Sequence, residues 1–169
     1  MTYIIDAYNV IKKWETYKNK KIDIFSFLNT VSKFSDYSQE KIIVVFDGKN
    51  KNEDLIQSKY TNIQIIFSGI KSTADSVIEK LITEKNDKKI KLITSDKAEY
   101  ESGLAENCII ISPAQFYDIT KNLMQESNKI NTKAEKINKK KWFTLSEIID
   151  KEILKKLDDN YENENKKTN

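Results

Sequence analysis

The chain contains no histidine and no arginine, and it has a single cysteine, Cys108, among its 169 residues. Without histidine, Ser-His and Cys-His nucleophile pairs and all His-ligated metal sites are excluded. One cysteine excludes an internal disulfide and any zinc site built from clustered thiolates. Any chemistry must therefore use carboxylates, lysines, hydroxyls and amides.

Long apolar runs and glycine-rich loops are also missing. No run approaches the ~20 apolar residues that a membrane-spanning helix needs, and residues 1–6 lack the basic-then-apolar pattern of a secretory signal. The three glycines, Gly48, Gly69 and Gly103, form no phosphate-binding loop, which disfavours a phosphatase or a nucleotide-binding protein. We therefore expect a cytoplasmic protein with no membrane partner.

The positive charge is carried by lysine alone. The chain has 29 basic and 26 acidic residues, so its net charge of +3 says little about its partners. Lysine contacts phosphates as a point charge and lacks the planar fork of arginine, so base-specific readout is not expected. Lysines are densest in residues 133–141. Such a run is typical of a solvated protein face. The alternative is a segment that attracts RNA through its positive charge.

Short runs of β-branched residues alternate with helix-like periodicity along the chain. Runs that are apolar on both faces suit strands of a parallel sheet buried between two helical layers. The expected strands are residues 3–5, 42–46, 63–67, 91–94 and 108–111. Apolar spacing of three and four residues predicts helices over 24–34 and 77–82 and from residue 113 onward. We expect an α/β three-layer sandwich with a central, mostly parallel sheet of about five strands.

The composition changes after about residue 127. Residues 1–127 are expected to form the α/β domain. Residues 128–157 are expected to form a lysine-rich linker or partly solvated helix and then a C-terminal helix that packs on or near the domain, capped by Thr144 or Ser146. The polar tail, residues 158–169, is expected to be disordered.

Aspartates follow the expected strands. Asp6, Asp47 and Asp96 each come directly after or close to a strand end, and Asp75 lies in the first turn of an expected helix. Ligand sites of parallel sheets lie at the carboxyl ends of the strands, where these four carboxylates would repel one another without a cation. Mg²⁺ or Mn²⁺ prefers such oxygen ligands and supports in-line displacement at phosphorus. Each aspartate alone could instead cap a helix or form a turn.

Other polar residues extend this candidate site. Asn9, one turn after the first strand, could orient a carboxylate or a water molecule. Glu79 and Glu99 each lie one helical turn after an aspartate and could support the metal ligands, with a solvated position paired to lysine as the alternative. Ser95 could bind a phosphate or cap the following helix.

Aromatic residues and lysines are interleaved after the first strand. Tyr8, Lys12, Lys13 and Trp14 occur in this segment, and Lys97 follows a later strand. Aromatic rings can stack unpaired bases while lysines hold phosphates, which suits single-stranded RNA. For Trp14 the alternative is a place in the hydrophobic core.

Four segments together resemble the NYN domains, a branch of the PIN-like nuclease superfamily. They are Ile4–Ile11, Val44–Gly48, Thr73–Glu79 and Thr94–Glu99, in the family's order and spacing. The closing segment, residues 145–157, is similar to that of the YacP-like proteins of bacteria. The resemblance covers nearly the whole chain except the tail.

The resemblance implies a PIN-like sheet and a metal-dependent endoribonuclease that acts on single-stranded RNA. For YacP-like relatives it further implies ribosome-associated cleavage of messenger RNA, which makes the ribosome a candidate partner. We expect Asp6, Asp75, Asp96 and Asn9 to be catalytic, with Mg²⁺ or Mn²⁺ held by the three aspartates and by Asp47. The alternatives are a non-catalytic RNA- or ribosome-binding module and a DNA nuclease of the same superfamily; the oligomeric state is left open.

Overall fold

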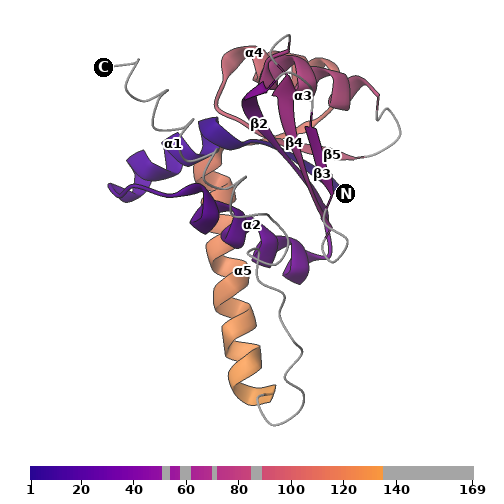
Figure 1. Ribbon diagram of the computed structural model, residues 1–169. Helices are drawn as coiled ribbons and strands as arrows, with labels where there is room; N and C mark the ends of the chain where they lie inside the picture. The colour runs from indigo at the N-terminus through magenta and orange to yellow at the C-terminus, as the bar shows by residue number, and fades with distance from the viewer. Residues whose placement is uncertain (51–53, 58–61, 70–71, 85–88, 135–169) are drawn as a thin grey trace.

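A six-stranded sheet in the order β3-β4-β2-β1-β5-β6 forms the centre of the computed structural model, which describes residues 1–50, 54–57, 62–69, 72–84 and 89–134 (Figure 1). The strands are β1 (Thr2–Asp6), β2 (Lys41–Asn50), β3 (Asp54–Gln57), β4 (Ile63–Gly69), β5 (Ile90–Ile93) and β6 (Ile109–Ile111). All neighbours pair in parallel except β3, which runs antiparallel to β4 at the edge. The predicted parallel sheet is confirmed, and β3 is an addition that the sequence did not indicate.

Helices cover both faces of this sheet. In the described residues they are α1 (Ala7–Lys18), α2 (Ile24–Ser38), α3 (Ala74–Thr83), α4 (Lys97–Ala105) and α5 (Pro113–Ala134). Helices α1, α2 and α5 pack on one face, whereas α3 and α4 pack on the other. The predicted three-layer α/β sandwich is therefore confirmed.

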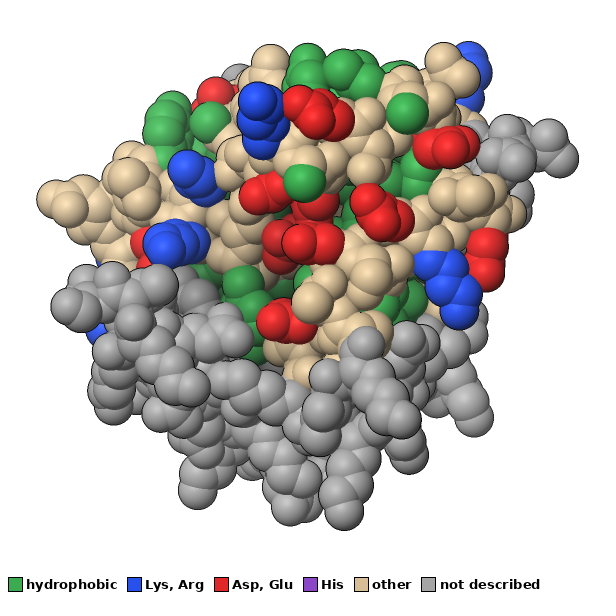
Figure 2. Space-filling model, turned by 90° about the horizontal axis from the view of Figure 1, so that it is seen from above, with side chains coloured by type: hydrophobic (Ala, Val, Ile, Leu, Met, Phe, Trp, Pro, Cys, Tyr) green, Lys and Arg blue, Asp and Glu red, His purple; other side chains and the backbone are tan. Residues whose placement is uncertain are grey.

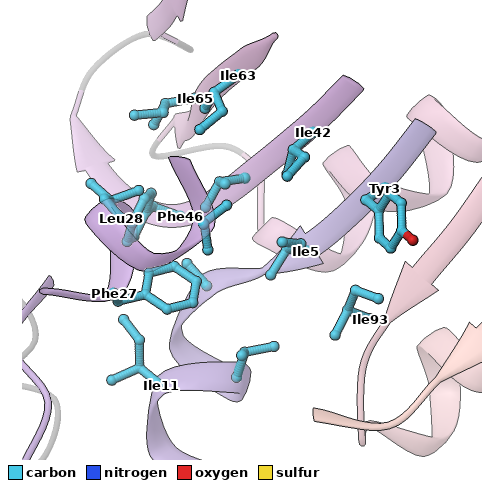
Figure 3. Packing of buried hydrophobic residues seen from close by; sticks show 14 of the residues in the cluster. Tyr3, Ile5, Ile11, Phe27, Leu28, Ile42, Phe46, Ile63, Ile65 and Ile93 are labelled. Carbon is cyan, nitrogen blue, oxygen red and sulfur yellow. The ribbon is translucent and has the colours of Figure 1, made fainter. Parts of the chain in front are cut away.

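Successive residues of β1 enter two separate cores. Tyr3 and Ile5 pack with α1, α2 and α5 (Figure 3), whereas Ile4 packs with α3 on the opposite face. Ile4 and Ile5 are completely buried, and burying a side chain of this size contributes roughly 1.5–3 kcal/mol. Because both faces of β1 are covered, its polar end at Asp6 is fixed at the carboxyl edge of the sheet.

Helix α5 starts at Pro113, as the sequence predicts, and continues to Ala134, beyond the expected domain boundary at residue 127. Most of the lysine-rich segment, the expected C-terminal helix over 144–157 and the tail 158–169 lie outside the described residues. Within the described part of the chain, none of the helices has the combination of length and hydrophobicity needed to cross a bilayer.

Candidate metal centre

Local capping interactions place two carboxylates at the carboxyl edge of the sheet. Asp6 ends β1 and caps α1, because its Oδ1 accepts a hydrogen bond from the Asn9 backbone N–H at 3.3 Å. Helix α3 begins with a capping box between Thr73 and Ser76, which puts Asp75 in its first turn. Both aspartates thus sit at helix starts next to the end of the central strand.

Carboxylate oxygens of Asp6, Asp75 and Glu99 lie within 4.8 Å of one another. We call these three residues the carboxylate triad. Its members come from the end of β1 and from α3 and α4, and they range from exposed Asp75 through half-buried Asp6 to buried Glu99. Figure 2 shows acidic side chains gathered near the middle of the face seen from above. The fold therefore brings together three negative groups that are distant in sequence.

Glu99 is the unusual member of the triad. It is 2% exposed, and among the described residues neither of its carboxylate oxygens has a hydrogen-bond partner. Burial raises its pKa from an ordinary value of 4.5 to about 8; the Thr94 hydroxyl lowers the pKa in part, without forming a regular hydrogen bond, and nearby negative charges raise it. An unpaired buried charge costs several kcal/mol unless something neutralises it.

Asp6 is perturbed in the same direction. Its pKa is raised from 3.8 to about 6, chiefly by burial. The hydrogen bond from Asn9 opposes this shift, and the charges of Asp75, Asp47 and Asp96 add to it. Three other aspartates therefore lie close enough to Asp6 to act on it through their charge.

The residues of the triad fit a hard divalent cation. They offer three carboxylate groups from separate elements, which is the donor type that Mg²⁺ and Mn²⁺ prefer. Among the described residues the buried Glu99 carboxylate has no hydrogen-bond partner, and a cation between it and the two aspartates would offset the repulsion among the three carboxylates.

Asp96, which the sequence predicts as a metal ligand, caps α4 instead of joining the triad. Its Oδ1 accepts from the backbone N–H groups of Ala98 at 2.8 Å and Glu99 at 3.3 Å. In a capping box, the glutamate three residues after the cap would bond the cap N–H. Here Thr94 Oγ1 accepts from the Asp96 N–H at 2.9 Å, so the Glu99 side chain is left to face the other carboxylates.

Replacing Asp96 with alanine is expected to lower the free energy of unfolding by about 1 kcal/mol, because α4 loses its cap. Asp96→Asn keeps an oxygen acceptor at the same position and should leave stability nearly unchanged. Urea unfolding of the two variants and the wild type would measure this difference. Equal losses in both variants would show that the charge of Asp96, and not its capping bond, stabilises the helix.

Asn9 and Ser95 connect the segments that follow β1 and β5. Asn9 Oδ1 accepts from the Ser95 N–H at 3.2 Å and from Ser95 Oγ at 2.9 Å. The backbone of Asn9 at the same time donates to Asp6. This pair of bonds holds the start of α1 next to the segment that leads into α4, and so fixes Asp6 relative to Glu99.

Asp47 and Glu79 lie outside the triad. Asp47 Oδ1 accepts from Ser68 Oγ at 2.8 Å, and β2 continues past Asp47 to Asn50. Glu79 Oε1 accepts from Ser102 Oγ at 2.9 Å, which links α3 to α4. Asp47 still acts on the site through its charge, because it raises the pKa of Asp6.

Trp14 is a core residue, and the prediction that its ring is available to stack on RNA bases is wrong. It is 1% exposed, and its indole Nε1 donates to the Pro113 carbonyl at 2.7 Å. Its ring stacks on Phe116 of α5 with 5.8 Å between centroids. Trp14 lies four residues after Val10, on the buried face of α1; this helical spacing was the signal for a core position.

The other residues predicted to contact RNA remain accessible. Lys12, Lys13 and Lys97 are exposed. Tyr8 is half-buried, and its ring meets Phe46 edge-on with 5.5 Å between centroids. Contact between these four residues and RNA stays a prediction.

The parallel sheet, its helical layers and the carboxylates at its carboxyl edge define an α/β domain of the PIN-like nuclease superfamily. More specifically, the chain belongs to the family of YacP-like NYN domains, whose model matches residues 3–162. The family resemblance carried by the four sequence segments is thus confirmed.

Individual relatives agree with this assignment. The chain is 30% identical over 105 residues to "Uncharacterized protein YacP" of Bacillus subtilis (strain 168); this match spans 57% of the chain and 61%, or less than two thirds, of that protein. A crystal structure of Rae1 (YacP) from Bacillus subtilis has a TM-score of 0.61 at 22% identity, covering 80% of this chain and 84% of that one. A structure of its tryptophan-to-leucine mutant has a TM-score of 0.62 at 22% identity and covers 99% of each chain. At this identity, the two structures support the fold alone.

Proposed function

We propose that this chain is a metal-dependent endoribonuclease that cleaves single-stranded RNA, with messenger RNA on the ribosome as its substrate. The YacP-like NYN family places the chain in a nuclease superfamily, and nucleic acid is therefore the substrate class. The lack of arginine favours recognition of phosphates without base-specific readout.

One observation carries the proposal: the buried Glu99 carboxylate lies against Asp6 and Asp75 without a hydrogen-bond partner in the described chain. A purely structural glutamate at 2% exposure would be expected to have such a partner. Burying this carboxylate without a partner lowers the stability of the fold, and a role in metal binding accounts for its presence.

Asp6, Asp75 and Glu99 would hold Mg²⁺ or Mn²⁺. When bound, such an ion supplies charge stabilisation at phosphorus and lowers the pKa of water. Asp96 and Asp47 would add negative charge around the triad, and Asn9 with Ser95 would keep Asp6 in position.

Substrate contacts would come from residues around the triad. Lys12, Lys13 and Lys97 would hold phosphates, since all three are exposed near the starts of α1 and α4. Tyr8 follows Asp6 by two residues, and its ring would pack against a base of the RNA as the RNA enters the site.

Incubating the purified chain with labelled messenger RNA tests this function. We expect cleavage with Mn²⁺ or Mg²⁺, none in EDTA, and stronger cleavage with translating ribosomes than without them. Single-stranded DNA of the same sequence should be cut more slowly, because the proposed substrate is RNA.

Two results would replace the proposed function, and a third would narrow it. RNA binding without cleavage in any divalent metal would identify a non-catalytic binding module. Faster cleavage of DNA than of RNA would identify a DNA nuclease. Equal cleavage of free and ribosome-bound messenger RNA would remove the ribosome from the proposal and leave the nuclease.

A further inference from the structure

A cavity of about 130 Å³ lies where α1 ends and α2 begins. Trp14 and Phe27 contribute to its walls, and three lysines line it: Lys18, Lys20 and Lys21. We call it the lysine cavity. Since a water molecule occupies about 30 Å³ in the liquid, the lysine cavity has room for a few water molecules or for one phosphate group.

One residue that lines the lysine cavity, Asp23, is acidic, and its carboxylate and that of Glu15 on α1 are already engaged. Asp23 caps α2, and its two oxygens accept from the Ser26 N–H at 2.8 Å and from Ser26 Oγ at 2.7 Å. Partial burial raises the pKa of Asp23, but hydrogen bonds from Ser26 and from the backbone of Asp23 and Phe25 together outweigh this effect and lower the pKa. Glu15 Oε1 accepts from the Ile22 N–H at 2.8 Å. These carboxylates thus satisfy backbone groups of the loop.

The lysines carry charge that is not paired with these acids. Within the described residues, no ion pair involves Lys18, Lys20 or Lys21. Lys18 Nζ instead lies 4.6 Å from the centroid of the Tyr117 ring on α5. This cation–π contact restricts the side chain while leaving its ammonium charged and exposed.

The backbone brings the three lysines to the same cavity. Asn19 ends α1 in the left-handed conformation, with φ 51° and ψ 41°, and so turns the chain sharply between Lys18 and Lys20. An asparagine tolerates this conformation better than most residues. The clustering of the lysines is therefore a product of the helix end.

The lysine cavity is well separated from the carboxylate triad. Helix α1 leads from Asp6 to Lys18 and contains 12 residues, which at a rise of about 1.5 Å per residue span about 18 Å. Figure 1 shows α1 leading away from the end of β1. Exposed Lys12 and Lys13 lie along this helix between the two sites.

We propose that the lysine cavity binds a backbone phosphate of the RNA strand several nucleotides from the bond that is cut. The inference rests on the proposed function, because it assumes that the strand also reaches the triad. Three lysines line the cavity, and lysine contacts to phosphate position a strand without reading its sequence. The site would therefore accept RNA and single-stranded DNA alike.

Binding of labelled RNA of about 16 nucleotides, a length typical of extended single-strand sites, tests the inference. The measurement is fluorescence anisotropy of the full chain in EDTA over a range of KCl concentrations. The triple variant K18Q/K20Q/K21Q is expected to lower the slope of log K against log salt by about 0.7, the contribution of one phosphate contact to a single strand. Single-stranded DNA of the same length should show the same change.

A matched variant removes the same charge elsewhere. Lys33, Lys41 and Lys89 are exposed, and Lys41 and Lys89 lie at or next to the amino ends of β2 and β5, opposite the triad. K33Q/K41Q/K89Q should leave the salt slope nearly unchanged. Equal slopes for the two triple variants would overturn the inference, and so would a change seen with RNA but not with DNA.

Cleavage kinetics separate this inference from the proposed function. The triple variant K18Q/K20Q/K21Q should lower kcat/KM about tenfold for an RNA of about 16 nucleotides. It should leave kcat/KM unchanged for a dinucleotide, whose single phosphodiester can occupy only the cleavage site. Equal impairment of both lengths would overturn the inference while leaving the nuclease intact. A chain that cuts no RNA but still shows the lysine-dependent salt slope would refute the nuclease and retain the phosphate site.

Discussion

Replacing Glu99 with glutamine is expected to lower metal-dependent RNA cleavage by more than about 100-fold. Mutation of a residue that only supports a metal ligand typically costs about 10–100-fold, and loss of a ligand itself should cost more. The amide has nearly the same shape as the carboxylate but carries no charge. The affinity for Mn²⁺ should fall in parallel. Calorimetric titration with Mn²⁺ and single-turnover cleavage would measure the two effects on the same protein.

Two further variants show whether the loss belongs to the triad. Asp6→Asn should reduce cleavage at least as strongly, while asparagine still caps α1. Glu101→Gln is the matched control, since Glu101 lies on the same helix but is 66% exposed and only weakly paired with Lys97 at 3.8 Å. If Glu99→Gln kept wild-type Mn²⁺ affinity and cleavage, Glu99 would not be a ligand and the triad would lose its role.

The sheet could be predicted because its strands are buried on both faces. A run such as 42–46 has no polar residue and is too short for a helix of ordinary length, so its assignment needs no tertiary information. The short edge strand β3, Asp54–Gln57, has two polar ends. It is a strand only because β4 pairs with it, and such pairing is decided by neighbours and not by intrinsic propensity.

The carboxyl edge of the sheet could be predicted from the sequence as the place of the acidic cluster, but the three members of the carboxylate triad could not. Asp6 and Asp75 follow from strand and helix boundaries. Asp96 and Glu99 both lie at the start of α4, and the choice between capping and facing the triad depends on Thr94, which accepts from the Asp96 N–H. That bond is local, since it joins residues two apart in the sequence, but a threonine at this position can also leave it unmade, so residue spacing alone does not decide the role of Glu99.

Trp14 illustrates a different ambiguity. Aromatic residues interleaved with lysines describe both an RNA-stacking surface and an amphipathic helix whose exposed side is lysine-rich. The buried partner of Trp14 is Pro113, 99 residues away along the chain. Only the packing of α5 against α1 decides between the two readings.

The metal-free protein is expected to lose stability as the pH rises from about 5 to about 8. The pKa of Glu99 is about 8 in the folded chain and that of Asp6 about 6, against ordinary values of 4.5 and 3.8. Below about pH 3 both the folded and the unfolded chain hold these protons, and no penalty exists. As the pH rises, the unfolded chain releases them first, so the folded state binds more protons and its free energy of unfolding falls.

The slope is about 1.4 kcal/mol per pH unit for each such group. For Glu99 the total loss between about pH 5 and about pH 8 is on the order of 4 kcal/mol, and Asp6 contributes only below about pH 6. Urea unfolding at a series of pH values in EDTA would measure the change. Glu99→Gln should remove most of it and make the variant more stable than the wild type at pH 8, whereas Glu101→Gln should follow the wild type.

A bound cation should offset a large part of this loss at high pH, since metal ligands must be deprotonated before they bind. Mn²⁺ or Mg²⁺ at about 100 times its Kd would add about 2.7 kcal/mol at pH 8, and much less at pH 5, where Glu99 and Asp6 are protonated in the folded chain. Glu99→Gln should lose this metal-dependent gain together with cleavage. A wild-type chain whose stability is the same at both pH values, with and without metal, would show that the Glu99 carboxylate is satisfied in some other way and that the triad binds no ion.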